Sequence, residues 1–339
     1  DWIGIGNDGQ DAFKSSISEA AGTTPERIAV HTVHQHDAPR CDLKSEYTQD
    51  VINRLGIAIK SSLKNSQAVT HVGYGQAEVY KVASNRKIYD ENGLVKKVRF
   101  TATLDTALHA APEGVIDPMV SMVSFWNGDK PIAMLSYYAS HPQSYYRTGV
   151  ANPDFPGVAR FLHQLKVPDA LHIYFTGAGG NIGAGKYNDA SHENRGILAY
   201  RLADGMERAW KSTKRELISA DKVDWSVVPV SLPADTTKDN SYVEKCKEGR
   251  TINIQCLALG RARILHLPGE LFVEYQLAAK AMRPELFVAV AAYGEMGPGY
   301  IPTAIGFEQG GYEARVSKVT PEAEEVLKSA MHKLLNKKL

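Results

Sequence analysis

Apolar and polar positions along this chain follow two rhythms, one typical of helices and one typical of strands. In six segments an apolar residue recurs every three or four positions, which predicts amphipathic helices. The predicted helices are Gln10–Ala21, Ser45–Leu63, Phe155–Leu165, His192–Trp210, Leu271–Met282 and Thr320–Leu335. Strict alternation or a short apolar run predicts strands. The predicted strands are Arg27–His34, Val69–Val82, Val98–Leu104, Met119–Trp126, Ile132–Tyr138, Leu171–Phe175, Val223–Leu232, Ile252–Leu259, Ala262–Leu267 and Leu286–Ala292.

The order of these elements predicts an α/β fold with a mixed β-sheet core flanked by helices. Asn127, Gly128 and Asp129 form a hairpin turn signal between two strands, which predicts an antiparallel pair. The later alternation of helices and strands predicts parallel crossovers in addition. The sequence contains no internal repeat, low-complexity segment or obvious linker, so we expect residues 1–339 to form a single domain.

Composition narrows the class of protein. The chain has 339 residues, of which 43% are hydrophobic and 23% are charged, as in ordinary globular proteins. Its net charge of +1 and mixed charge pattern argue against a nucleic-acid partner. It contains no apolar run of about 18 residues, so no transmembrane segment is expected. The cysteines, Cys41, Cys246 and Cys256, leave open either one Cys246–Cys256 bridge or three free thiols.

Four polar clusters lie where predicted strands end. His34 and His36 share one face at the end of a strand, so both imidazoles can approach one point, and such a pair is a recurrent metal-ligand arrangement. His141 follows the strand Ile132–Tyr138, and Glu270 lies between a strand and a helix. Tyr300 follows the strand Leu286–Ala292 within a segment rich in Gly and Pro. Open α/β sheets place their ligands at such strand ends.

A glycine-rich loop, Thr176–Lys186, follows the strand Leu171–Phe175. Its glycines allow close approach of a ligand to the backbone, but it matches neither of the common nucleotide-binding loops. Because strand ends on one edge of a sheet converge on a single cleft, we expect Asn181, Lys186 and Asn188 to line the same pocket as the metal ligands.

Taken in order, these motifs resemble the catalytic domain of the neutral ceramidase family. His34-Gln35-His36-Asp37-Ala38-Pro39 is similar to the family's HTHSGP-type element. The remaining correspondences are Asn85-Arg86, His141, Asp154-Phe155-Pro156-Gly157, Gly269-Glu270-Leu271-Phe272, Gly299-Tyr300-Ile301-Pro302-Thr303 and Tyr312-Glu313. The resemblance covers nearly the whole chain, and it depends on the order and spacing of the motifs rather than on any one of them.

The resemblance implies a zinc ion held by His34, His141, Glu270 and Tyr300, and the choice between His34 and His36 stays open. It also implies a periplasmic or extracellular location. The chain departs from the family in three ways. Gly183 stands where the family has a serine, the family's first strand lies upstream of Asp1, and its C-terminal immunoglobulin-like domain is not present in this sequence.

Three classes of function follow. The first is a zinc-dependent hydrolase acting on an amide or related bond, with ceramide itself a poor substrate because of Gly183. The second is a metal-dependent polysaccharide lyase or other carbohydrate-active enzyme, and the third is an inactive metal-binding homologue. The expected catalytic residues are His36, Asp37, Arg86, Arg147, Lys186 and Tyr312. Among them, His36 or Asp37 could act as the base, and Arg86, Arg147 or Lys186 could hold an anionic group of the substrate. The expected substrate-binding residues are Asn85, Asp154, Asn181 and Asn188. The substrate is expected to be a small lipid-like or saccharide molecule, and the sequence does not determine the oligomeric state.

Overall fold

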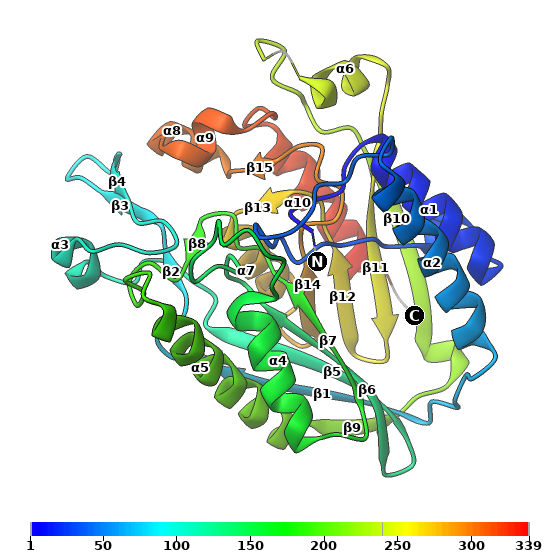
Figure 1. Ribbon diagram of the computed structural model, residues 1–339. Coiled ribbons are helices and arrows are strands. Elements are labelled where there is room, and N and C mark those ends of the chain that lie inside the picture. The colour runs from blue at the N-terminus through cyan, green and yellow to red at the C-terminus, as the bar shows by residue number, and fades with distance from the viewer. Residues whose placement is uncertain (1, 239, 338–339) are drawn as a thin grey trace.

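The computed structural model describes residues 2–238 and 240–337 (Figure 1). The helices are α1 Asp8–Ala21, α2 Glu46–Leu63, α3 Thr106–Ala110, α4 Asp154–Lys166, α5 His192–Lys211, α6 Ser241–Lys247, α7 Val273–Met282, α8 Ala304–Gln309, α9 Tyr312–Val316 and α10 Ala323–Leu335. The longer strands are β1 His71–Glu78, β5 Met119–Asn127, β6 Lys130–Tyr138, β7 Leu171–Thr176, β9 Lys214–Leu217, β10 Val223–Val230, β11 Ile252–Leu259, β12 Ala262–His266 and β14 Phe287–Ala291. Short strands are β2 Ser84–Asn85, β3 Lys87–Tyr89, β4 Val95–Val98, β8 Ile182–Gly183, β13 Glu270–Leu271 and β15 Tyr300–Ile301.

Two mixed sheets form the centre of the fold. One has the strand order β7-β6-β5-β1-β9, and the other has the order β10-β11-β12-β14. In the first sheet the β6–β7 pair is parallel while β5 pairs antiparallel with both β1 and β6. In the second sheet only the β12–β14 pair is parallel. The expected mixed α/β fold is therefore confirmed.

Alternation along the strands directs side chains into different apolar layers. On β5, Met122 packs toward α4 and α5, whereas its neighbour Val123 packs toward the second sheet. On β12, Ile264 faces the first sheet, and Leu265 faces α7 and α10. The result is a stack of helices, sheet, sheet and helices, in which neighbouring layers bury the faces of the central strands (Figure 1).

Several sequence predictions are corrected by the structure. Arg27–His34 is not a strand, because its residues pair with no other strand in the described chain. Val98–Leu104 is not a strand either: β4 ends at Val98, and irregular chain follows up to α3. The short elements β9 and α6 were not predicted. Of the two alternatives for the cysteines, the structure has the second: Cys41, Cys246 and Cys256 are free thiols, with no Cys246–Cys256 bridge.

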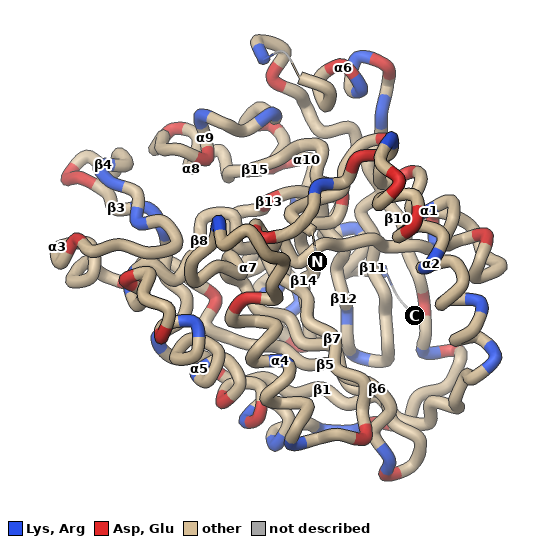
Figure 2. Tube along the Cα trace, in the orientation of Figure 1, with Lys and Arg blue, Asp and Glu red and all other residues tan. Residues whose placement is uncertain are grey.

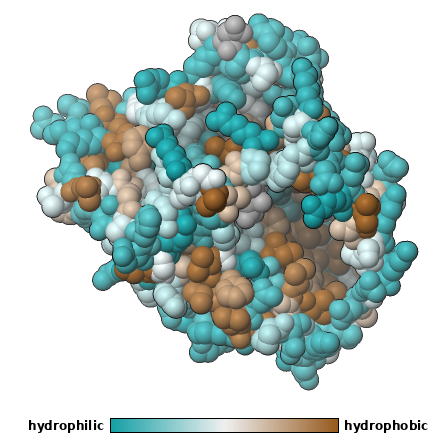
Figure 3. Space-filling view, viewed as in Figure 1, coloured by the Kyte–Doolittle hydropathy of each residue, from teal (hydrophilic) through white to brown (hydrophobic). Residues whose placement is uncertain are grey.

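The unpaired segment Arg27–His34 leaves open space beside the edge strand β7. A cavity of about 390 Å³ there is lined mainly by apolar side chains, among them Trp2, Phe13, Val30 and Ile173. Figure 3 shows brown, apolar side chains in the hollow on this face of the molecule. A sequence with strand-like alternation can thus remain irregular when no neighbouring strand completes its backbone hydrogen bonds.

Charged residues of both signs are mixed along the chain, in agreement with the net charge of +1 (Figure 2). None of the helices within the described residues has the length and apolarity needed to cross a membrane.

Candidate metal centre

Three buried side chains from distant parts of the chain meet at one point. The Nε2 atom of His34 lies 3.1 Å from Oε2 of Glu270, and the Nε2 atom of His141 lies 3.3 Å from the same oxygen. The candidate ligand atoms of the three residues all lie within 4.8 Å of one another. Their exposed fractions are 2% for His34, 1% for His141 and 7% for Glu270, so water is largely excluded from the cluster.

Backbone carbonyls set the tautomer of both imidazoles. The Nδ1 atom of His34 lies 2.6 Å from the carbonyl oxygen of Ile3. The Nδ1 atom of His141 lies 2.7 Å from the oxygen of Gly179 and 3.0 Å from that of Ile182. Because a carbonyl oxygen only accepts, Nδ1 carries the proton in each ring, and each Nε2 presents a lone pair to Glu270.

Toward one another, the three groups are therefore all acceptors. Oε2 of Glu270 has no hydrogen-bond partner among the described residues, although it is buried. Two imidazole lone pairs and a carboxylate oxygen repel one another at these distances unless a cation lies among them. Buried charges in proteins are normally paired or bound to metals. The donor set therefore fits a metal ion.

Local backbone geometry brings these groups together. β13 and β15 pair in parallel so that Glu270 is directly opposite Tyr300. Behind them, Gly180 packs so closely that an added Cβ atom would lie 2.3 Å from the backbone oxygen of Glu270. His34 and Tyr293 both have positive φ, 64° and 58°, and their rings stack with centroids 4.6 Å apart. Such left-handed backbone in large side chains is uncommon and is concentrated at functional sites.

Tyr300 and Arg86 extend the cluster on one side. The Tyr300 hydroxyl lies 3.4 Å from Nε2 of His141, and Nη1 of Arg86 donates to that hydroxyl at 3.2 Å. The same nitrogen donates to the carbonyl of Gly180 at 3.1 Å. The structure therefore brings together all four residues expected as metal ligands and places Arg86 behind Tyr300.

The electrostatics of the cluster follow from burial and mutual charge. Burial raises the pKa of Glu270, but the positive charge and hydrogen bonds of His34 and His141 in their protonated forms outweigh it and hold that pKa well below its usual range. Burial, reinforced by Arg86, lowers the pKa of His141 to about 4, so its imidazole is neutral at physiological pH. Burial also raises the pKa of Tyr300, with Glu270 adding to this effect and Arg86 opposing it.

His36 lies beside the cluster and at the edge of a cavity. Its Nε2 atom is 3.1 Å from Nε2 of His34, and burial together with the neighbouring histidines lowers its pKa to about 3. With Arg147 and Val150 it lines a cavity of about 490 Å³. Asp37 accepts hydrogen bonds from the backbone of Arg147 and from the side chains of Thr148 and Asn152, so it organises the loop that forms this cavity. Its role as a base stays a prediction.

The other residues expected to bind substrate already have hydrogen-bond partners within the protein. The Lys186 ammonium donates to the carbonyls of His109 and Ala111 at the end of α3. Asn188 donates to the carbonyls of Thr101 and Ser144. Both side-chain hydrogen bonds of Lys186 therefore go to backbone carbonyls rather than to an open cavity. The anion-binding role expected for this lysine gains no support from its contacts.

Three further residues follow the same pattern. Asn85 donates to the carbonyl of Val115, and Asn181 donates to Glu274. The carboxylate of Asp154 accepts from the backbone of Ser144 and Phe155 and from Arg195. These contacts stabilise the loops around the cluster, and the predicted substrate contacts of Asn85, Asp154 and Asn181 stay predictions.

Tyr312 and Glu313 lie at the start of α9, next to the cluster. The Tyr312 ring contacts the Tyr300 ring edge-on, with centroids 5.8 Å apart. Glu313 is completely buried and lies 3.6 Å from Nη1 of Arg86. Tyr293, which stacks on His34, was missed from the sequence, since a tyrosine at the end of an apolar strand gives no signal of this contact.

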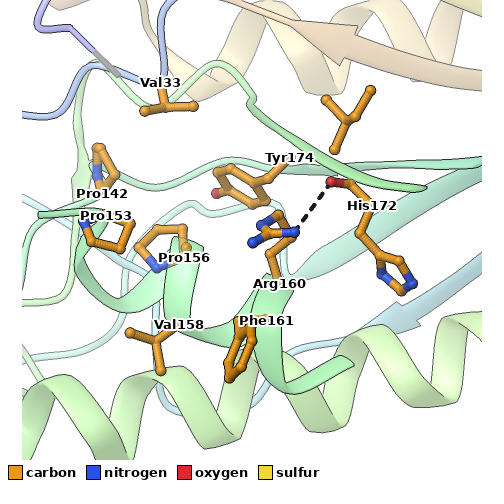
Figure 4. Close-up of a pocket in the computed structure, with 11 residues that line it drawn as sticks. Val33, Pro142, Pro153, Pro156, Val158, Arg160, Phe161, His172 and Tyr174 are labelled. Carbon is orange, nitrogen blue, oxygen red and sulfur yellow. Dashed lines mark hydrogen bonds between the residues drawn. The ribbon is translucent and has the colours of Figure 1, made fainter. Parts of the chain in front are cut away.

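A larger cavity of about 530 Å³ lies between α4 and β7 (Figure 4). Its walls include Val33 and Pro142, the chain neighbours of His34 and His141. Arg160 crosses it and donates to the carbonyl of His172 and to Gln164. The cavity is thus mainly apolar and separate from the three-residue cluster, whose side chains do not line it.

Comparison with solved structures identifies the fold. The structure is similar to that of the neutral ceramidase from Pseudomonas aeruginosa, with a TM-score of 0.70 and 14% sequence identity, over 98% of this chain and 64% of that chain. A structure described as a ceramidase complexed with C2 is similar with a TM-score of 0.70 and 12% identity, over 96% of this chain and 65% of that one. Neither a protein-family model nor a curated protein matches the sequence. This chain therefore has the neutral ceramidase fold and spans slightly less than two thirds of the length of those two proteins.

Proposed function

We propose that this protein is a zinc-dependent hydrolase in which His34, His141, Glu270 and Tyr300 hold the metal. The observation that carries the proposal is the convergence of buried acceptors with no donor among them, two imidazole nitrogens and one carboxylate oxygen within 4.8 Å. A divalent cation satisfies such a set, and nitrogen and oxygen ligands of this kind suit zinc. The fixed Nδ1 hydrogen bonds of both histidines support the proposal, since zinc-binding histidines commonly have them.

When bound, zinc supplies Lewis-acid chemistry that polarises a carbonyl group and makes water nucleophilic near neutral pH. The residues of the chain have complementary roles. His36 lies beside the cluster and on the cavity wall, so we assign proton transfer to its imidazole. Arg86 orients Tyr300 through its hydrogen bond, and Arg147 on the wall of the same cavity is placed to hold an anionic group of the substrate.

The proposed substrate is an amide or a related acyl compound that carries a polar or anionic group near the scissile bond. Ceramide is expected to be a poor substrate, because Gly183 stands where the family has a serine and Arg147 gives the cavity a cation. A Cβ atom added at Gly183 would lie 3.2 Å from the carbonyl oxygen of Phe100, so a small movement of the backbone near Phe100 would make room for a side chain. Gly183→Ser is therefore expected to fold and to raise activity on ceramide.

The carbohydrate lyase remains the second candidate, favoured by the same cation. Arg147 beside His36 would neutralise a uronate carboxylate while the imidazole removes the neighbouring proton. The two candidates give different products: a lyase produces a new double bond that absorbs in the ultraviolet, and an amidase releases an amine and a carboxylic acid.

The test combines metal analysis with a small substrate panel. We expect one zinc per chain in purified protein, and zinc-dependent release of fatty acid from N-acyl amino acids, which carry a carboxylate. Ceramide and a uronate oligosaccharide serve as comparisons, and chelator-treated protein serves as the control. Efficient ceramide cleavage would contradict the substrate assignment, an ultraviolet-absorbing product would favour the lyase, and protein that binds no zinc would refute the proposed function altogether.

A further inference from the structure

Glu313 is the most unusual charged residue outside the proposed ligand set. It lies on α9, and its side chain is completely buried. Both of its carboxylate oxygens lack a hydrogen-bond donor among the described residues. A buried carboxylate without donors is costly, and natural proteins retain few such groups. Its burial therefore calls for an explanation beyond packing.

The nearest cation to Glu313 is Arg86. Nη1 of Arg86 lies 3.6 Å from Oε1 of Glu313, and the exposed fractions of the two side chains are 6% and 0%. This nitrogen already donates to Gly180 and to the Tyr300 hydroxyl, at 3.1 and 3.2 Å. Its hydrogen atoms are thus directed toward Tyr300 and the glycine loop, and Glu313 acts on the guanidinium mainly through charge.

The charge of Arg86 next to a metal site explains why a buried carboxylate is needed at Glu313. Nη1 of Arg86 lies 3.5 Å from Nε2 of His141 and 3.2 Å from the Tyr300 hydroxyl, so the guanidinium lies beside the ligand atoms of two proposed ligands. A metal dication bound by those atoms would repel it. The fully buried negative charge of Glu313, 3.6 Å from the same nitrogen, offsets that repulsion and keeps the guanidinium against Tyr300.

Other residues in and next to α9 also contact Tyr300. The ring of Tyr312 packs against that of Tyr300, and the Ser317 hydroxyl, which follows the helix, donates to the backbone carbonyl of Tyr300 at 2.8 Å. Glu313 is the member of this group that reaches Tyr300 through Arg86. The segment therefore holds the tyrosine at its ring, its backbone and its oxygen.

We propose that Glu313 is a positioning residue, which holds the Arg86 guanidinium against the Tyr300 oxygen and thereby fixes Tyr300 for bonding to the metal. The inference rests on the proposed metal site. It assigns no proton transfer and no substrate contact to Glu313, so loss of this residue should change the metal–tyrosine bond while leaving the histidine ligands in place.

The test uses copper as a probe in the full chain. A tyrosine bound directly to Cu(II) produces a visible charge-transfer band, which reports the Tyr300–metal bond without any substrate. We expect Glu313→Gln to bind one copper per chain with a weakened or shifted band. Its zinc affinity should fall about 10- to 100-fold, as is usual when a partner of a metal ligand is lost. Arg86→Lys should cause a similar change, and the double variant should lose little more, because Glu313 acts through Arg86.

Asp117→Asn is the matched control. Asp117 is another buried carboxylate, and it accepts hydrogen bonds from Gln276 and Lys280 rather than from any residue of the cluster. Its removal should lower the thermal stability of the protein without changing the copper band. This control separates loss of a buried charge in general from loss of the contact with Arg86.

Each outcome decides a different point. An unaltered band and unaltered zinc affinity in Glu313→Gln would overturn the inference alone. Wild-type protein that binds copper without the tyrosine band would contradict both the proposed ligand Tyr300 and this inference. If Glu313→Gln does not fold, Glu313→Asp can be used, because it keeps the negative charge but moves it away from Arg86 by the length of one methylene group. An unaltered band in Glu313→Asp would likewise overturn the inference.

Discussion

Replacing Glu270 by Gln should stabilise the metal-free protein and reduce the stability that zinc adds. The substitution keeps the shape of the side chain, removes its charge and adds an amide donor. In the metal-free protein Oε2 of Glu270 lies 3.1 and 3.3 Å from two imidazole nitrogens that present lone pairs. An amide nitrogen placed there can donate to them. We expect the metal-free variant to be more stable by about 1–3 kcal/mol, the usual cost of a buried acceptor without a partner.

Zinc should act in the opposite direction and favour wild-type protein by about 2.3 kcal/mol, the difference between the two gains worked out below. Four-ligand zinc sites provide about 10–16 kcal/mol of binding free energy, or roughly 3 kcal/mol per ligand, so loss of the anionic ligand should weaken zinc binding at least about 100-fold. At a free zinc concentration of about 100 times the wild-type Kd, wild-type protein gains about 2.7 kcal/mol of stability. A variant that binds about 100-fold more weakly gains only about 0.4 kcal/mol under the same conditions.

Chemical denaturation in chelator and in buffered zinc measures both quantities. The Asp117→Asn variant again serves as the control, because it should lose the same stability under both conditions. The reasoning would be refuted if Glu270→Gln were destabilised in chelator yet retained the full zinc-dependent gain, since Glu270 would then be a structural ion-pair partner rather than a ligand.

Three further predictions concern the ligands, their support and acid stability. Elemental analysis should find less than one zinc per chain in His34→Ala and one zinc per chain in His36→Ala. If both variants bound one zinc per chain, His34 would not be a ligand. Gly180→Ala should displace the backbone of the proposed ligand strand β13, because the new Cβ would lie 2.3 Å from a carbonyl oxygen, and should reduce both zinc content and stability. Gly196→Ala in α5, where nothing lies within 4 Å, should instead stabilise by up to about 1 kcal/mol. Burial lowers the pKa of His163 from 6.5 to about 4, so between these pH values the unfolded chain binds a proton that the folded protein does not. The free energy of unfolding should therefore fall by up to about 1.4 kcal/mol per pH unit as the pH drops from 6.5 to about 4. Urea titrations of His163→Gln should show a smaller dependence on pH.

The periodicity of apolar residues predicted the main helices and most core strands, because both patterns are local. It failed at Arg27–His34 and at Val98–Leu104. The first has strand-like alternation, but a strand also needs a partner, and no local pattern reveals whether one is present. The sequence likewise missed the edge strand β9, whose four residues are all exposed and therefore carry no apolar signal.

By itself, the sequence marked His34, His141, Glu270 and Tyr300 as polar residues at the ends of predicted strands or strand-to-helix turns, which made them candidates for one site, although the strand expected before His34 does not form. Only the tertiary structure decided that they meet, because β13 and β15 pair across about 30 positions and the histidines come from two separate irregular segments. The carbonyls that orient the imidazoles, such as Ile3 and Gly179, are contacts of this kind too. The type of a residue limits which groups it can bind, but packing between distant segments decides which group it does bind. For the same reason Lys186, a plausible anion ligand in the sequence, is instead bound to two backbone carbonyls.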